Sequence, residues 1–114
     1  IYDSADSRAL IKRLVKEMQA DTMGFTVSAV AGKISRLKNE LVDAEGYSRQ
    51  LNPNDPTEVM FLELFRRYTA ELRRANAFDF DDLIAQTVYL FRAFPHVAAL
   101  YQRRFRHILI DEYQ

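Results

Sequence analysis

Two adjacent carboxylates, Asp111 and Glu112, follow a short apolar run near the end of the 114-residue sequence. The run is Ile108, Leu109 and Ile110, and continuous Ile/Leu/Val runs are typical of buried parallel strands. Ligands of open α/β sheets gather at the carboxyl ends of such strands. An Asp there can hold Mg²⁺, and a neighbouring Glu can polarise a water for attack on a phosphoryl group. An edge strand followed by a charged turn has the same spacing, so the pattern alone leaves both interpretations open.

A second acidic group contains Asp79, Asp81 and Asp82. Asp79 is a favourable helix N-cap, and the other two then fall in the first turn, where the helix dipole favours negative charge. A metal cluster is the alternative. Adjacent Asp residues in a first turn point in different directions, however, and no His or further acid lies near in the sequence. We therefore expect these residues to have a structural capping role.

Basic side chains form three groups, each of which has a solvated helix face as its simplest explanation. The groups are Lys33/Arg36/Lys38, Arg66/Arg67/Arg73/Arg74 and Arg103/Arg104/Arg106. Lys33, Arg36 and the nearby Asn39 are spaced i, i+3 and i+6, so they can share one face toward a phosphate backbone.

Composition restricts the class of protein. The sequence is 48% hydrophobic and 28% charged, as expected for one soluble globular domain with a modest core. Basic and acidic residues balance at 16 each, so a nucleic-acid contact needs a local patch. The lack of cysteine excludes disulfides and thiolate metal sites and is compatible with the cytoplasm. No apolar run approaches the roughly 20 residues of a membrane span, so we expect no membrane partner.

The elements that must position these side chains are mostly helical. Glycine and proline number only three each, which favours long helices. Caps and apolar periodicity predict five helices, followed by one terminal β-strand. The helices are expected over about residues 4–19, 26–42, 55–75, 79–94 and 95–106, with a loop over 45–54. The predicted fold class is therefore mainly α.

Aromatic and aliphatic residues on the helical stripes predict the core. Leu83 and Ile84 are expected to face inward from the fourth helix. The aromatic residues that fall on apolar stripes are Phe61, Phe65, Tyr68, Phe80 and Phe91.

Four segments resemble one family of proteins. The final Asp111-Glu112-Tyr113-Gln114 resembles the Walker B box, or motif II, of superfamily 1A DNA helicases of the UvrD/PcrA/Rep type. Residues 78–84 are similar to the family's Asp-Phe-Asp-Asp-Leu signature, and residues 34–41 to part of its helical insertion, domain 1B. Residues 1–3 resemble the exit from the first RecA-like domain, 1A. The segments follow the family's order across essentially the whole chain.

This resemblance implies a domain organisation. Residues 1–6 would be a flank from the RecA-like domain 1A, and residues 7–106 would be the helical domain 1B. Residues 107–114 would return to domain 1A as its Walker B strand. The sequence begins without Met and ends directly after the box, so we expect a piece of a larger bacterial protein.

The resemblance also implies an activity for the parent: ATP-dependent 3′ to 5′ movement along single-stranded DNA with unwinding of duplexes, in DNA repair or replication. Asp111 corresponds to the Mg²⁺-linked acid, and Glu112 to the residue that activates the hydrolytic water. Gln114 corresponds to a residue near the γ-phosphate, whereas Tyr113 receives no chemical role. ATP and Mg²⁺ would be the parent's cofactors.

Domain 1B lies beside the DNA path in this family, and the aromatics that stack on single strands belong to other domains. The implied partners are single-stranded DNA and a duplex junction. The candidate DNA-binding residues are Lys33, Arg36, Lys38 and Asn39.

The phosphate-binding motif GxxxxGK[ST] is absent, because the only glycines are Gly24, Gly32 and Gly46. Without its amides and Lys, nucleotide phosphates have no cradle, so we expect the chain alone to be inactive and to hold no cofactor. Two alternatives are a module that docks a repair or transcription partner and part of an AddA/RecB-type helicase-nuclease, although such chains usually carry larger insertions.

Overall fold

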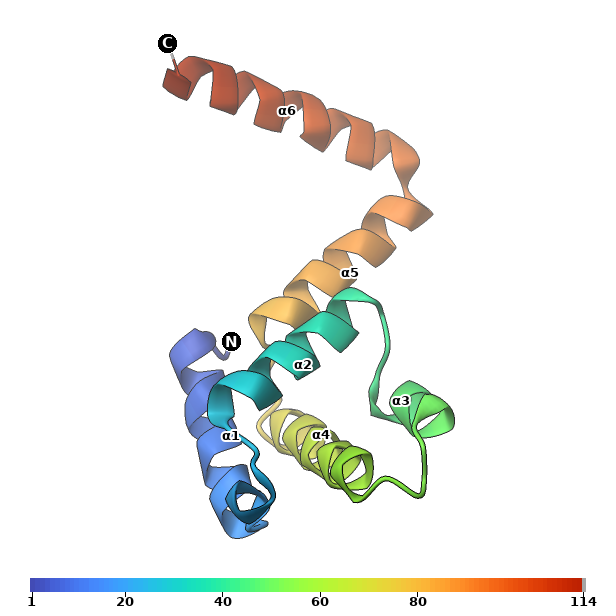
Figure 1. Cartoon of the computed structure of the whole chain (residues 1–114). Helices are drawn as coiled ribbons and strands as arrows, with labels where there is room; N and C mark the ends of the chain where they lie inside the picture. Colours follow the sequence, from blue (N-terminus) through green and yellow to red (C-terminus); the bar gives the residue numbers. More distant parts are fainter. Residues whose placement is uncertain (114) are drawn as a thin grey trace.

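A computed structural model describes the backbone of residues 1–113 and the side chains of residues 1–107. Within that range the chain forms six α-helices and one 3-10 helix, η1. Helices α1 to α4 form a packed unit, and α5 and α6 form an elbow that extends away from it (Figure 1). The elements are α1 (Ser4–Glu17), η1 (Ala20–Met23), α2 (Val27–Asn39), α3 (Ala44–Gln50), α4 (Pro56–Arg74), α5 (Phe80–Ala93) and α6 (Pro95–Tyr113).

Side-chain caps fix where the helices begin. A carboxylate or hydroxyl accepts a hydrogen bond from the first turn of each of the first five α-helices, which satisfies an amide that has no partner within the helix. These N-caps are Asp3, Thr26, Asp43, Asp55 and Asp79. Three helices are followed by residues with a left-handed backbone, a common way to end a helix. These residues are Gln19 after α1, Leu41 after α2 and Asn76 after α4.

One hydrophobic core lies among α1, η1, α2, α3 and α4, and its residues lie between Leu10 and Leu72. Phe61 on α4 is its aromatic centre, with its ring 5.2 Å from that of Tyr47 and 5.9 Å from that of Phe65. Phe65 and Tyr68 are also buried, so the prediction that these α4 aromatics are core residues is confirmed.

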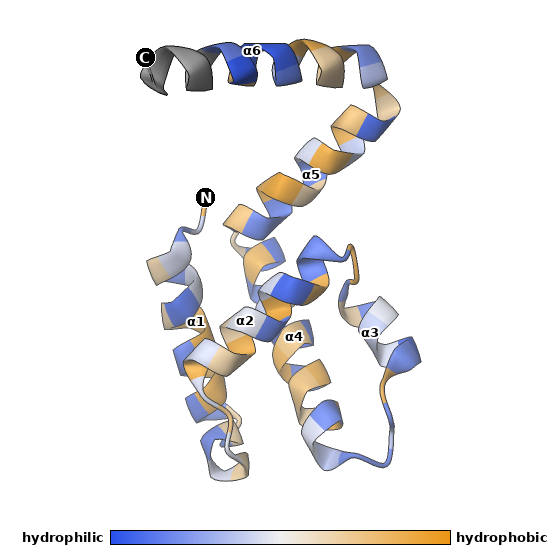
Figure 2. Ribbon diagram, turned by 45° about the horizontal axis from the view of Figure 1, so that its top comes forward, coloured by the Kyte–Doolittle hydropathy of each residue, from blue (hydrophilic) through white to orange (hydrophobic). Residues whose placement is uncertain are grey.

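Helix α5 packs on α2 and α6 but contains no buried residue. Figure 2 shows apolar residues along α5, outside the packed unit. The prediction that Leu83 and Ile84 face inward is wrong, because they are 37% and 38% exposed, and Phe80 is 67% exposed. Phe91 is half-buried and stacks on Tyr101 of α6 at 5.9 Å. The apolar spacing predicts the apolar stripe of α5 correctly, but the described chain supplies too little partner surface to cover that stripe.

Among the described residues, no single helix is long and apolar enough to cross a membrane. Residues Phe80–Ala93 and Pro95–His107 meet the criteria of length and composition only as a pair, bent by 119°.

The predicted count of five helices with a terminal strand is wrong. Residues 44–50 form α3 within the predicted loop, because Asp43 caps the Gly46 amide at 2.7 Å and Tyr47 is buried. Residues 108–110 continue α6. The extended pairing among the described residues is one isolated bridge, between Tyr2 and Asp79. Without a neighbouring strand, a helix satisfies the backbone hydrogen bonds within a single segment. The mainly α class is confirmed.

Candidate functional site

Asp79 is the centre of a polar cluster where α5 begins. Its side chain is buried, with 3% of the residue exposed. One carboxylate oxygen, Oδ2, accepts hydrogen bonds from Lys38 Nζ at 2.7 Å and from the Tyr68 hydroxyl at 2.6 Å. The other, Oδ1, accepts from the Asp82 amide at 2.8 Å and so caps α5. A single carboxylate therefore links α2, α4 and α5.

Helix α2 holds the other two acidic residues of this turn as well. Lys38 Nζ also contacts Asp82 Oδ1 at 3.0 Å, and the Ser35 hydroxyl donates to Asp81 Oδ1 at 2.9 Å. The Lys38 ammonium lies 5.3 Å from the centre of the Tyr68 ring, within the range of a cation–π contact. All three carboxylates at the start of α5 are thus tied to α2.

The cluster shifts two pKa values. Burial acts to raise the pKa of Asp79, but hydrogen bonds from Lys38, Tyr68 and the Asp82 amide outweigh it and leave that pKa below 3.8. Burial, and then the hydrogen bond to the Asp79 carboxylate, raise the pKa of Tyr68 well above 10. At neutral pH the arrangement is therefore an ionised Asp79 facing a protonated Tyr68 that donates to it.

Acid should weaken the fold through Asp79. Its folded-state pKa lies below the unfolded value near 3.8, so its contribution is fully present above that value and is lost as the pH falls through the folded-state pKa. Urea unfolding between pH 6 and pH 2 should therefore show a loss of stability below about pH 4. Asp79→Asn removes the titrating group and should flatten this acid limb. An equally steep acid limb in Asp79→Asn would contradict the assignment.

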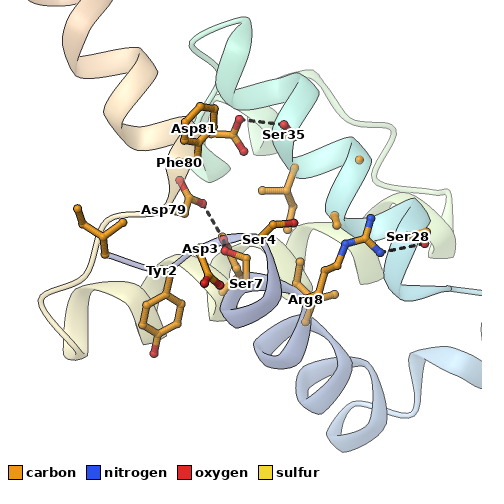
Figure 3. Close-up of a pocket in the computed structure, with 16 residues that line it drawn as sticks. Tyr2, Asp3, Ser4, Ser7, Arg8, Ser28, Ser35, Asp79, Phe80 and Asp81 are labelled. Carbon is orange, nitrogen blue, oxygen red and sulfur yellow. Dashed lines mark hydrogen bonds between the residues drawn. The ribbon is translucent and has the colours of Figure 1, made fainter.

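A groove of about 550 Å³ lies beside the cluster, between α1, α2 and the start of α5 (Figure 3). Arg8 lies at one end and donates to the Ser28 hydroxyl at 3.3 Å. Asp79 and Asp81 lie at the other end, next to the exposed ring of Phe80. Serine hydroxyls from both helices line the space between, namely Ser4, Ser7, Ser28 and Ser35. The groove thus combines one arginine, several hydroxyls, an aromatic face and the carboxylates of Asp3, Asp79 and Asp81.

The basic residues of α2 are of two kinds: Lys33 and Lys38 contact neighbouring side chains, whereas Arg36 is exposed. Lys33 Nζ contacts the Tyr47 hydroxyl at 3.0 Å and lies 4.3 Å from the centre of the Phe61 ring. The Lys38 side chain is 12% exposed and is held by carboxylates. Arg36 and Asn39 are exposed. The four candidate DNA-binding residues of α2 therefore do not form one free basic face.

The acidic pair at the end of the chain lies apart from this groove. Asp111 and Glu112 belong to α6, which leads away from the packed unit (Figure 1). Their side chains, and Gln114 as a whole, lie outside what the structure describes. Within the described part of the chain, no group of three or more His, Cys, Asp or Glu residues could hold a metal ion.

Two features of the groove were missed from the sequence. Phe80 falls on the apolar stripe of α5, and periodicity cannot distinguish a core face from one that this chain leaves uncovered. Arg8 and Ser28 lie 20 residues apart in the sequence, so no local spacing connects them. The one available signal was the position of Phe80 between the two residues of a capping box, Asp79 and Asp82.

The sequence profile of the UvrD/REP helicase N-terminal domain family matches residues 1–114. The chain belongs to this family. It is 44% identical over 115 residues to the ATP-dependent DNA helicase UvrD1 of Mycobacterium leprae (strain TN). It is also similar to UvrD1 of Mycobacterium tuberculosis (strain H37Rv), at 41% identity, and to the ATP-dependent DNA helicase PcrA of Bacillus subtilis (strain 168), at 37% identity.

Each of these three alignments covers all of this chain and 15% of the relative. The chain of this UvrD/REP family member therefore spans about one seventh of the length of these relatives. No solved structure matches it.

Proposed function

We propose that this chain is part of an ATP-dependent 3′ to 5′ DNA helicase of the UvrD/PcrA type that acts in DNA repair or replication. The match of the family profile to residues 1–114 carries the proposal. In the whole protein, residues 7–106 would form the helical domain 1B, with residues 1–6 and 107–114 belonging to the RecA-like domain 1A. The bacterial relatives and the DNA substrate favour a cytoplasmic location.

The nucleotide chemistry would need parts beyond this chain. Asp111 would be the acid linked to Mg²⁺, Glu112 the activator of the hydrolytic water and Gln114 a neighbour of the γ-phosphate. ATP and Mg²⁺ would be cofactors of the whole protein. The glycines at positions 24, 32 and 46 cannot form the phosphate-binding motif, so the chain alone should not hydrolyse ATP.

The DNA contact would be the groove beside α5. Phe80 is 67% exposed at its edge. An exposed aromatic ring can stack on a base of a single strand, so Phe80 would add to the stacking aromatics that the resemblance places in other domains. Arg8 and the serine hydroxyls would contact the phosphates, because such side chains make most backbone contacts. On α2, Arg36 and Asn39 are exposed for the same task. Lys33 could join them only by leaving its aromatic contacts.

Binding should be weak and salt-dependent. The net charge of the chain is zero, so long-range attraction to DNA is small and a few local cations must supply the affinity. A duplex junction would meet the chain through the same surface, with the rest of the protein providing further contacts.

Replacing Phe80 with alanine should weaken binding to a single strand by about 1 kcal/mol, or roughly fivefold, because one stacked base is lost. Fluorescence anisotropy at low salt measures this, with a labelled single strand and a tailed duplex. Phe94→Ala is the matched control: Phe94 is 56% exposed at the bend between α5 and α6, away from the groove lining. The same preparations with ATP should release no phosphate. Absence of binding by the wild-type chain at tens of micromolar would remove the DNA contact, and equal losses in both variants would remove the role of Phe80.

A protein-docking role is the second candidate, and the exposed apolar residues of α5 and α6 favour it. They include Phe80, Leu90, Leu100 and Phe105, and contiguous apolar surface often marks a protein contact. A repair or transcription partner would then bind in a manner that survives nuclease treatment and charge reversal at Lys33 and Arg36. Loss of partner binding in either condition would count against this candidate.

A further inference from the structure

The position of Phe80 depends on its sequence neighbours rather than on its own packing. The ring is mostly exposed, so burial does not hold it. The residues on either side are held instead: Asp79 by Lys38, and Asp81 by Ser35. Both partners belong to α2, which also forms one wall of the groove. The ring therefore projects from a turn that α2 fixes at several points.

Lys38 contributes most to this connection. It bridges Asp79 and Asp82, the two residues of the capping box of α5, at 2.7 and 3.0 Å. These residues flank Phe80 and Asp81 in the sequence. A capping box by itself sets only where a helix begins, whereas a cation from another helix also sets where that start lies in space. Loss of the bridge would leave the start of α5 held by Ser35, by Tyr68 and by the backbone pairing of Tyr2 with residues 78 and 79.

The same geometry makes Lys38 a poor phosphate contact. Its side chain is 12% exposed, and the Asp79 side chain that it pairs with is 4% exposed. Turning the ammonium toward DNA would leave that carboxylate buried without its cation, which is strongly unfavourable. Lys38 is a DNA-binding candidate from the sequence because it belongs to the basic group Lys33/Arg36/Lys38. In the structure its ammonium is paired with Asp79 and Asp82.

We propose that Lys38 is a positioning residue of the nucleic-acid groove: through the Asp79–Asp82 capping box it fixes Phe80 at the groove edge without touching DNA. This inference rests on the proposed function for its consequence, because a fixed ring matters only if the groove receives a base. The structural part of the inference, that Lys38 sets the position of Phe80, does not depend on DNA binding.

Salt dependence distinguishes a positioning lysine from one that contacts phosphate. Removing one phosphate contact lowers the slope of log K against log salt by about 0.7 for a single strand. Lys38→Met should weaken binding about fivefold, as the loss of stacking does, with the slope unchanged. Arg36→Gln is the matched control, since Arg36 is an exposed cation on the same helix; this variant should lower the slope. A lower slope in Lys38→Met would overturn the proposal.

A double-mutant cycle separates action through Phe80 from general damage. If Lys38 acts by positioning the ring, then Lys38→Met should have no further effect on binding once Phe80→Ala is present. Full additivity of the two changes would overturn the proposal, because it would mean that Lys38 supports binding by another route.

The structural part of the inference is tested by NMR relaxation and chemical shifts of the backbone amides, without DNA. Lys38→Met should shift and loosen residues 79–82 while the amides of core residues Leu14 and Phe65 stay unchanged. Should this variant not fold, Lys38→Met with Asp79→Asn removes both charges and keeps a side-chain cap. Unchanged amides at residues 79–82 would overturn the inference. If the wild-type chain binds no DNA, the proposed DNA contact fails, and this measurement still decides whether Lys38 positions Phe80.

Discussion

Replacing Asp79 with alanine should lower the free energy of unfolding by about 3 kcal/mol, because three kinds of stabilisation are lost together. The helix cap of α5 disappears, the buried Tyr68 hydroxyl loses its shortest hydrogen bond at 2.6 Å, and Lys38 loses its closer carboxylate at 2.7 Å. Urea denaturation at pH 7, followed by circular dichroism, measures this loss. Asp82 still faces Lys38, which keeps the ammonium from being entirely unpaired.

Asp81→Ala is the matched control, since it removes a carboxylate from the same turn. Asp81 makes one side-chain contact, with the Ser35 hydroxyl at 2.9 Å, so the expected loss is within about 1 kcal/mol. Asp79→Asn should fall between the two, because asparagine also caps helices but carries no charge. Equal losses for Asp79→Ala and Asp81→Ala would show that the cluster is no more than a set of ordinary caps.

The role of Asp79 shows how far sequence reasoning extends at this site. The cap itself is local, since Asp79 and Asp82 are three residues apart, and the sequence is sufficient to predict it. The cation that neutralises Asp79 lies 41 residues earlier in the chain. Lys38 is a DNA-binding candidate from the sequence because it lies in a basic group within the segment that resembles domain 1B. Its contact with Asp79 depends on the tertiary fold and is not visible in the sequence.

The secondary structure shows the same difference between features set by nearby residues and features set by distant contacts. Caps and apolar periodicity placed α1, α2, α4 and α5 close to their observed ranges, because both signals act within a few residues. Helix α3 was missed, since Gly46 and the nearby polar residues favour a loop, while the burial of Tyr47 that stabilises it comes from Phe61 on α4. The strand predicted over 108–110 required a partner strand that the described chain does not provide. Local signals in the sequence were therefore sufficient to predict four helices. Features that depend on contacts between residues distant in the sequence, such as α3, could not be predicted from them.

Two phenylalanines show why an apolar stripe alone does not define a core. Phe65 on α4 and Phe80 on α5 both fall on such stripes, yet Phe65 is 1% exposed and Phe80 is 67% exposed. Helix α4 packs on both α1 and α3, so its apolar face is covered. The apolar face of α5 projects beyond the packed unit (Figure 2).

Phe65→Ala should therefore lower the free energy of unfolding by about 4 kcal/mol, through lost burial and the cavity that remains. Phe80→Ala should change it by no more than about 0.5 kcal/mol, because its ring is already mostly in water. Urea denaturation of both variants measures the difference, and only Phe80→Ala should combine near-wild-type stability with weaker DNA binding. A large stability loss in Phe80→Ala would mean that the ring is packed after all, and its effect on DNA would then reflect unfolding. The contrast thus tests in one pair of variants whether exposure marks Phe80 as a binding residue.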